Sequence, residues 1–486
     1  MSASIAIIAA PLTPVVGAFV IWLARNHAWP REATTIVASL IMFGLVASLY
    51  PEVAAGGRPS VVLAEPLPGL TLAFEVEPLG LLFALVASFL WIVTSVYSIG
   101  YMHSHHETNL TRYFVCFALS LGAAIGVAFA ANLFTLFVFY EALTLATYPL
   151  VAHRGDELAR RGARVYLGVL LATSIGMFLF AIILTWNAAG TLDFVPGGIL
   201  ADKMTPTMTA VLLGLFVFGI GKAAVMPFHR WLPAAMVAPA PVSALLHAVA
   251  VVKAGVFSVM KITVYIFGIE NLAAIGASRW LMYVAAATVL IGSIVALNSD
   301  NLKARLAYST ISQLAYIVLG AMLANAWGVI GGGMHIAMHA FAKITLFLCA
   351  GAIVIVTERI NVSELRGLGR AMPVTMGAFL VASLSIIGLP PFGGMWSKWY
   401  LALGTLEAGE YPLLAVLLLG SILSAAYLIP IPLRAFFSPP DDPQADARLG
   451  EAPLACVVPL TVTAFVCLVL FVYPDPLYRL LSALVP

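Results

Sequence analysis

The chain has 486 residues, of which 62% are hydrophobic and only 9% are charged, and its formal net charge is +2. Soluble globular proteins carry about 45–50% apolar and about 25% charged residues, so the composition excludes an ordinary soluble protein and indicates an integral membrane protein. The small net charge gives no reason to expect a nucleic-acid partner.

Apolar segments long enough to cross a bilayer recur along the whole sequence. A helix needs about 20 mainly apolar residues to cross roughly 30 Å of hydrocarbon. No basic stretch precedes the first segment, so we expect a retained helix rather than a cleaved signal peptide. The sequence predicts about fourteen spans, with approximate limits 3–23, 33–50, 78–99, 112–130, 132–151, 163–186, 208–230, 242–266, 280–298, 304–324, 327–356, 373–404, 411–435 and 453–473.

The basic residues of the loops alternate in number along the chain. Loops after odd-numbered spans hold 15 Lys and Arg residues, whereas the opposite loops hold four, which are Arg58, Lys203, Arg279 and Arg479. Because basic loops stay in the cytoplasm, this bias predicts both termini on the non-cytoplasmic side of the cell (inner) membrane. A missed or additional span would scramble the alternation, so the bias also supports the number of spans.

A few charged residues lie inside the predicted spans. A charge at the centre of a bilayer costs at least about 2.5–3.5 kcal/mol on insertion scales, so such residues are expected to be functional. Glu141 is the only acid near the middle of a span. In a structural alternative, Glu141 neutralises one lysine and joins two helices. One carboxylate cannot neutralise all the basic residues inside the spans. These residues are Lys222, Lys253, Lys261, Lys343 and Lys398.

All five of these basic residues are lysines, and this choice favours proton transfer. Desolvation lowers the pKa of an ammonium group by several units, so a buried lysine can lose and regain a proton near neutral pH, whereas arginine stays charged. Lys261 lies near the outer end of its span, and we interpret it as a side chain that extends to the membrane interface.

Histidines join the buried lysines in two spans. His335, His339 and Lys343 follow one another at intervals of four residues, so they share one helix face over about 12 Å. This spacing predicts a proton relay; the structural alternative is that each histidine donates to a backbone carbonyl. His247 and Lys253 are six residues apart, which places them on different faces of the eighth span.

Two spans contain residues that break helices. Pro227 follows Lys222 in the seventh span, and the segment GLPPFGG (388–394) precedes Lys398 in the twelfth. Interrupted spans in corresponding positions of two halves indicate a transporter with inverted repeats. Because the two breaks are five spans apart, the sequence predicts two five-helix units, spans 4–8 and 9–13.

The sequence offers no motif for a cofactor or a metal. The cysteines have no metal-ligand spacing, and we find no phosphate-binding loop and no haem or iron–sulfur ligands. We therefore expect no cofactor, no metal and no catalytic residue in this chain, which would be energised by an ion gradient or by a partner. The alternatives from other classes are a redox enzyme and a passive structural subunit.

Four segments of the chain carry a resemblance. They are the run from Lys222 through PFHRWLPAAMVAPAPVSALLHAVAVVKAG (227–255), DNLKARLAYSTISQLAY (300–316), HIAMHAFAKITLFL (335–348) and GLPPFGGMWSKWYL (388–401). In this order they resemble the antiporter-like membrane subunits shared by Mrp-type multisubunit Na⁺/H⁺ antiporters, respiratory complex I and membrane-bound hydrogenases. The resemblance covers about residues 75 to 435.

The resemblance implies an all-α fold of about fourteen transmembrane helices with two inverted five-helix repeats and broken helices 7 and 12. The predicted organisation is helices 1–3 in residues 1–111, repeat one in 112–266, repeat two in 267–435, and a loop and helix 14 in 436–486. Glu141 is expected to pair with Lys222. The implied proton-transfer residues are Glu141, Lys222, His247, Lys253, His335, His339, Lys343 and Lys398.

The first functional hypothesis is a proton-translocating subunit of a cation/proton antiporter, similar to the D-type member of the Mrp complexes, because the chain ends soon after its fourteenth span. The second is a proton-pumping membrane subunit of complex I or of a membrane-bound hydrogenase, in which this chain would hold no redox centre. Either implies protons, the lipid bilayer and other membrane subunits as partners. One buried carboxylate is too few for a sodium site, so transported sodium would bind to a partner protein of the complex.

Overall fold

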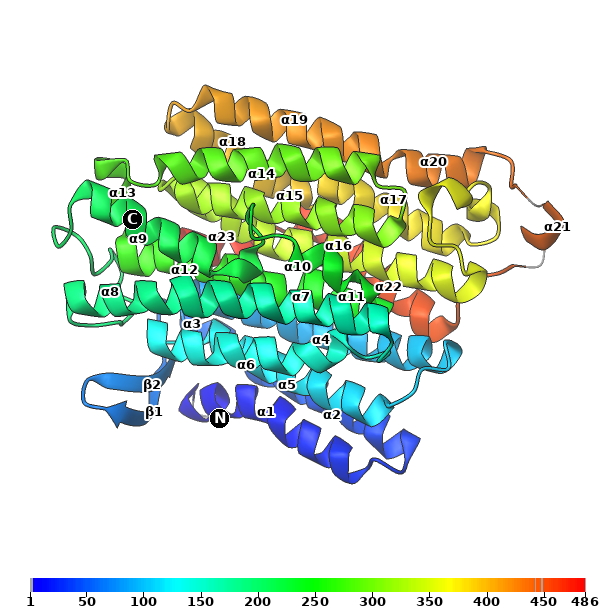
Figure 1. Ribbon diagram of the computed structural model, residues 1–486, viewed down its shortest axis with the longest axis horizontal. Coiled ribbons are helices and arrows are strands. Elements are labelled where there is room, and N and C mark those ends of the chain that lie inside the picture. The colour runs from blue at the N-terminus through cyan, green and yellow to red at the C-terminus, as the bar shows by residue number, and fades with distance from the viewer. Residues whose placement is uncertain (1–2, 442, 447–448, 486) are drawn as a thin grey trace.

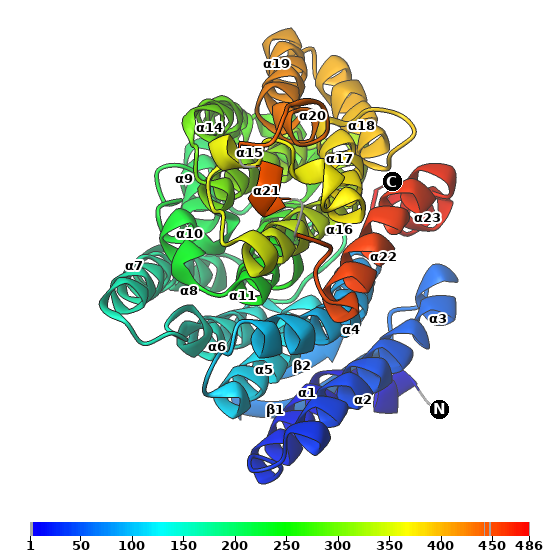
Figure 2. The same cartoon turned by 90° about the vertical axis from the view of Figure 1, so that its right-hand side faces the viewer.

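The computed structural model describes residues 3–441, 443–446 and 449–485. Its helices run side by side along the long axis of the molecule, and most connections gather at the two ends (Figure 1). Figure 2 looks along the helices and shows α1 and α2 at one side of the bundle and α19 at the opposite side. The arrangement is that of a helical bundle with two loop-bearing faces.

The N-terminal part contains a hairpin that the sequence analysis did not predict. Strands β1 (Ser60–Leu67) and β2 (Leu70–Glu75) pair antiparallel and lie beside the helices at one end of the bundle (Figure 1). The helices of this part are α1 (Ala3–Leu23), α2 (Ala28–Ala47), α3 (Tyr50–Ala54) and α4 (Pro78–Ser104).

The next elements cover the first predicted repeat. Short π-helical and 3₁₀ segments, labelled η, interrupt several of its helices. The elements are α5 (Leu110–Ala128), α6 (Leu133–Val151), α7 (Glu157–Thr173), η1 (Ser174–Phe178), α8 (Leu179–Ala189), α9 (Pro206–Gly219), η2 (Gly221–Ala223), α10 (Trp231–Ala234), η3 (Ala235–Val237), α11 (Ala240–Ala244), η4 (Leu245–Val249), α12 (Val251–Ile262) and η5 (Thr263–Phe267).

The remaining elements cover the second predicted repeat and the C-terminal part. They are α13 (Ile269–Ile275), α14 (Arg279–Asn298), α15 (Leu302–Met322), α16 (Ala326–Thr357), η6 (Val362–Glu364), η7 (Leu368–Arg370), α17 (Pro373–Ile387), α18 (Gly394–Glu407), α19 (Tyr411–Leu428), α20 (Pro430–Phe437), α21 (Pro443–Asp446), α22 (Leu454–Val472) and α23 (Asp475–Ser482).

Within the described residues, 11 helices are long and apolar enough to cross a membrane. The other three predicted spans are present as helices but differ in kind. The seventh and twelfth are interrupted, so α9 and α17 are short, while α15 is too polar to be counted by hydropathy. The fold is therefore a mainly α-helical membrane bundle with one β hairpin, and the number of fourteen spans stays a prediction.

Two buried elements form the centre of the bundle. The continuous segment from α11 to η5 is buried along its most apolar stretch, and α16 is buried from Gly328 to Ile353. Helix α16 packs against α15, α17, α18 and α22 and also contacts α12. Charged side chains on α12 and α16 are consequently held inside the protein, away from lipid.

Two junctions in the bundle have the same hydrogen-bond pattern. At each junction an asparagine caps a helix, Asn132 for α6 and Asn301 for α15. The residue after the asparagine donates its N–H to the loop that precedes a broken span. The bonds are Leu133 N to Leu192 O (3.0 Å) and Phe194 N to Ala131 O (3.1 Å), and Leu302 N to Ile360 O (2.9 Å) and Val362 N to Asp300 O (2.8 Å). An internal repeat of five spans would produce this match, and the repeat boundaries stay a prediction.

Candidate proton-transfer site

The break in the seventh span directs the side chain of Lys222 toward α6. Helix α9 ends at Gly219, and Lys222 lies in the short turn η2, fully buried. The Lys222 Nζ donates to Tyr140 O at 2.8 Å and to Thr144 Oγ1 at 2.6 Å. It also lies 3.1 Å from the centroid of the Tyr140 ring, close enough for a cation–π interaction. Neutral oxygens and an aromatic face therefore surround this charge.

The structure does not bring Glu141 into contact with Lys222. Both carboxylate oxygens of Glu141 are buried, and among the described residues they have no hydrogen-bond partner and no cation within 4.0 Å. Tyr140 and Thr144 lie on one face of α6, whereas Glu141 is turned by about 100° around the helix. The two charges still interact electrostatically at longer range.

The same break packs against α12. A Cβ added to Gly255 would collide with the backbone of Lys222 and Ala223, so this close approach requires glycine. Lys253 lies two residues earlier on α12, but no hydrogen bond joins its side chain to Lys222 in the described structure. The two lysines are neighbours in the fold whose side chains are directed to different partners.

A continuous polar chain begins at Lys253. Its Nζ lies 2.6 Å from Nδ1 of His339, so a hydrogen bond joins the two bases. The ring of His339 stacks on that of His335, with centroids 5.8 Å apart and planes 19° apart. Lys343, the third member of the predicted face, donates to Ser309 Oγ at 2.8 Å. The interval of four residues therefore does place both histidines in contact.

From His335 the chain continues to the second broken span. Its Nδ1 lies 2.8 Å from Ser397 Oγ on α18, and its Nε2 lies 3.2 Å from Gln313 Oε1 on α15. Tyr316 packs on the His335 ring at 5.7 Å, and the Nζ of Lys398 lies 4.8 Å from the Tyr316 ring centroid. These contacts link α16 to Lys398 through hydroxyl, amide and aromatic groups.

Lys398 itself bonds to the end of α17. Gly388, with φ of 89°, ends that helix and leaves its last carbonyls without helical partners. The Nζ of Lys398 donates to Ile387 O at 3.0 Å and to Ser421 Oγ at 2.9 Å. The break therefore supplies the oxygen that holds this lysine.

His247 lies apart from this chain. It sits in the π-helical turn η4, and both of its ring nitrogens are buried without a hydrogen-bond partner in the described structure. Its ring packs on Phe347 with centroids 4.6 Å apart, and it interacts electrostatically with Lys343 and Lys303. Of the predicted residues, the structure thus links Lys253, His339, His335 and Lys398 through hydrogen bonds and ring contacts. The link between the two histidines is a ring contact, since Nε2 of His339 has no hydrogen-bond partner in the described structure. Glu141, Lys222, His247 and Lys343 do not contact this chain directly.

The interpretation of Lys261 as an interfacial side chain is wrong. Its side chain is only 1% exposed, and its Nζ lies 3.2 Å from Oε1 of Glu77 and 2.8 Å from Ala130 O. The loop after α8 covers it, with the Phe194 ring 4.9 Å away, so protein rather than the interface surrounds the charge.

Glu77, which directly precedes the third predicted span, is also a buried acid. Its carboxylate caps α4 by accepting from the N–H groups of Leu79 and Gly80, both at 2.7 Å. Pro78 was the available signal for the helix start, because proline is over-represented at the first helical position. The pairing of Glu77 with Lys261 could not be read from that signal.

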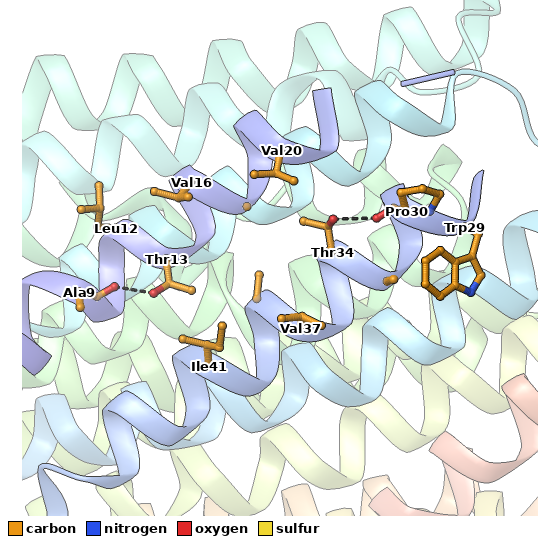
Figure 3. A pocket seen from close by; sticks show the side chains of 13 residues that line it. Ala9, Leu12, Thr13, Val16, Val20, Trp29, Pro30, Thr34, Val37 and Ile41 are labelled. Atoms are coloured by element: carbon orange, nitrogen blue, oxygen red, sulfur yellow. Dashed lines mark hydrogen bonds between the residues drawn. The ribbon is translucent and has the colours of Figure 1, made fainter. Parts of the chain in front are cut away.

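A groove between α1 and α2 carries no such chemistry. It has a volume of about 600 Å³ and an almost wholly apolar lining. Figure 3 shows its two threonines, and each hydroxyl donates to its own helix, Thr13 to Ala9 O and Thr34 to Pro30 O, both at 2.7 Å. The lining residues include no titratable side chain, so the groove offers no group for proton transfer.

The bundle with its buried lysines and histidines is that of an antiporter-like membrane subunit. The family model described as NADH:quinone oxidoreductase/Mrp antiporter, transmembrane part, matches residues 130–424, and one described as the N-terminus of complex I chain 5 matches residues 69–114. The chain belongs to the NADH:quinone oxidoreductase/Mrp antiporter family. It is an antiporter-like, proton-translocating membrane subunit of that family.

Individual relatives lie on both branches of the family. NADH-quinone oxidoreductase subunit N of Desulforudis audaxviator (strain MP104C) is 33% identical over 416 residues, which cover 82% of each chain. A protein of Rhizobium meliloti (strain 1021), described as a probable K⁺/H⁺ antiporter A/B subunit, is 31% identical over 90% of this chain, which spans 44% of that longer protein. A component of the Mrp complex from Dietzia sp. DQ12-45-1b has the same fold, with a TM-score of 0.85 over 100% of this chain and 97% of that one, at 22% identity.

Proposed function

We propose that this chain is the proton-translocating subunit of a multisubunit cation/proton antiporter, similar to the D-type member of the Mrp complexes, and that protons move along its buried lysine–histidine axis. The observation that carries the proposal is the chain of contacts from Lys253 through His339 and His335 to Lys398. Lysine and histidine exchange protons when they are desolvated. The relative described as a K⁺/H⁺ antiporter component supports the antiporter assignment.

The first half of the axis works by changing the surroundings of Lys222. Near Glu141 the lysine keeps its proton, because an opposite charge favours the charged form. Bonded only to Tyr140 O and Thr144, it has lost that close partner and can release the proton toward Lys253. Arrival of the proton at Lys398 then alters the charge felt by the next membrane subunit.

A second candidate function is favoured by a specific relative. The protein described as NADH-quinone oxidoreductase subunit N is 33% identical to this chain over 82% of both lengths. In that case the same axis would pump protons in a respiratory or hydrogenase complex, driven by electron transfer in partner subunits. The redox centres would belong to those partners.

The two functions differ in what drives proton movement. The test uses inverted membrane vesicles that contain the complete complex and a pH-sensitive dye in the lumen. The antiporter predicts a change in lumenal pH when Na⁺ or K⁺ is added, and none that requires NADH or hydrogen oxidation. Proton movement that occurs only during electron transfer would overturn the antiporter assignment and support the second function.

A further inference from the structure

A buried ion pair stands outside the axis described above. Lys261 on α12 and Glu77 before α4 approach to 3.2 Å, with side chains only 1% and 2% exposed. Removing two charges from water costs several kcal/mol per ion, and such pairs are weak contributors to stability. The pair therefore calls for a role besides holding two helices together.

The pair continues as a hydrogen-bonded network toward the surface. Tyr265 donates its hydroxyl to Glu77 Oε2 at 3.1 Å, and Arg58 Nη2 lies 3.1 Å from the same hydroxyl. Arg58 also pairs with Glu75 on β2 at 3.4 Å, and these two side chains are 30% and 26% exposed. The network thus runs from the interior to water at the end of the bundle that carries the hairpin (Figure 1).

The inner end of the network points back to the axis. Lys261 and Lys253 lie on the same regular helix, eight residues apart, so they share a face at a separation of about 12 Å. Phe257 lies midway between them and packs on Phe83 with ring centroids 5.0 Å apart. The Lys261 Nζ lies 5.4 Å from the Phe257 ring. One aromatic layer therefore separates the buried axis from this network.

The outer end is suited to exchange with water. Burial raises the pKa of the Glu75 carboxyl, and the facing Arg58 guanidinium opposes this rise. A partly exposed carboxyl with a raised pKa takes up and releases protons closer to neutral pH than an ordinary surface acid.

We propose that Lys261, Glu77 and Tyr265 form a proton port, through which the axis at Lys253 exchanges protons with the face of the protein that carries the β hairpin. Arg58 holds Tyr265 and Glu75 in place at the outer end of the port and is not itself a relay, because arginine does not release its proton. Phe257 and Phe83 form the barrier that must rearrange for each transfer. The port rests on the proposed function, since it has a purpose only where the axis carries protons.

Proton transport by the variant Lys261→Arg distinguishes a proton port from a structural ion pair. Arginine keeps the positive charge opposite Glu77 but does not release its proton. The port predicts proton transport at least about tenfold slower in vesicles that contain the assembled complex. A structural pair predicts wild-type transport. Lys203→Met, which removes an exposed lysine from a loop, is the matched control and should transport normally.

Two further variants make every outcome decisive. Tyr265→Phe leaves the ion pair intact and removes the hydroxyl. Slower transport in this variant supports the port, and an unchanged rate overturns it. This result decides the question even if the Lys261→Arg variant does not assemble. Lys222→Met is measured in parallel. Wild-type transport in that variant overturns the proposed function itself. Loss of transport there, with wild-type rates in Lys261→Arg and Tyr265→Phe, overturns only the port.

Discussion

The two broken spans hold their lysines in different ways. Lys222 is fully buried in the turn η2 and reaches across to α6, where a tyrosine carbonyl and a threonine hydroxyl accept its hydrogen bonds. Lys398 is partly buried on α18 and bonds to the carbonyl that ends α17, inside its own broken span. The first lysine thus depends on another helix alone, whereas the second bonds both to its own broken span and to Ser421 on α19.

The difference extends to their electrostatic surroundings. A carboxylate, Glu141, interacts with Lys222 from beyond contact distance, whereas no carboxylate forms an ion pair with Lys398 among the described residues. Lys398 is instead joined to the histidines of α16 through Tyr316. Direct contacts to neutral groups hold both lysines, but among the described residues only Lys222 also has a carboxylate within electrostatic range.

The largest expected effect follows from replacing Lys222. Lys222→Met should lower proton transport by about 10²-fold or more while the complex still assembles, because no other titratable group replaces the lysine. Lys222→Arg is the control: it keeps a charge but does not release a proton, so it should also fail. Wild-type transport with normal assembly in either variant would contradict the proposed proton axis.

Replacing Lys398 should have a smaller effect. Lys398→Met removes the last member of the chain, but Ser397 and Gln313 still contact His335, and transport should fall by about tenfold. The initial rate of lumenal pH change in vesicles measures this. A loss as deep as that of Lys222→Met would remove the distinction between the two ends of the axis.

Glu141 provides a third comparison. Because its carboxylate makes no contact with Lys222, Glu141→Gln should remove about 1 kcal/mol of long-range interaction and slow transport by about fivefold without loss of assembly. Blue native electrophoresis and the transport rate would be measured together. If assembly alone is lost, Glu141 is a structural residue that joins helices.

The last expected effect concerns stability and lies at the contact between η2 and α12. Gly255→Ala would force a Cβ against the backbone of Lys222 and should destabilise the protein by about 1–3 kcal/mol. Thermal unfolding of the purified complex measures this. Gly377→Ala on α17 meets no atom within 4 Å and is the matched control, expected to leave the unfolding temperature unchanged or higher. Equal behaviour of the two variants would contradict the close approach.

Much of the site could be predicted from the sequence because its spacing is local. The interval of four residues between His335 and His339 fixes a shared helix face wherever the helix packs, and the structure stacks the two rings. Proline and glycine near Lys222 and Lys398 likewise act on their own backbone, and both spans are interrupted where these residues lie.

The sequence by itself determined that the chain is a membrane protein, which segments are apolar, and which lysines lie among them, because composition and helical period are properties of neighbouring residues. The tertiary structure alone decided the partners. Lys222 meets α6 across 82 residues of sequence, Lys261 meets Glu77, and His247 packs on Phe347 without a hydrogen-bond partner in the described structure. Such pairings depend on how helices pack and rotate against one another, which no local pattern specifies.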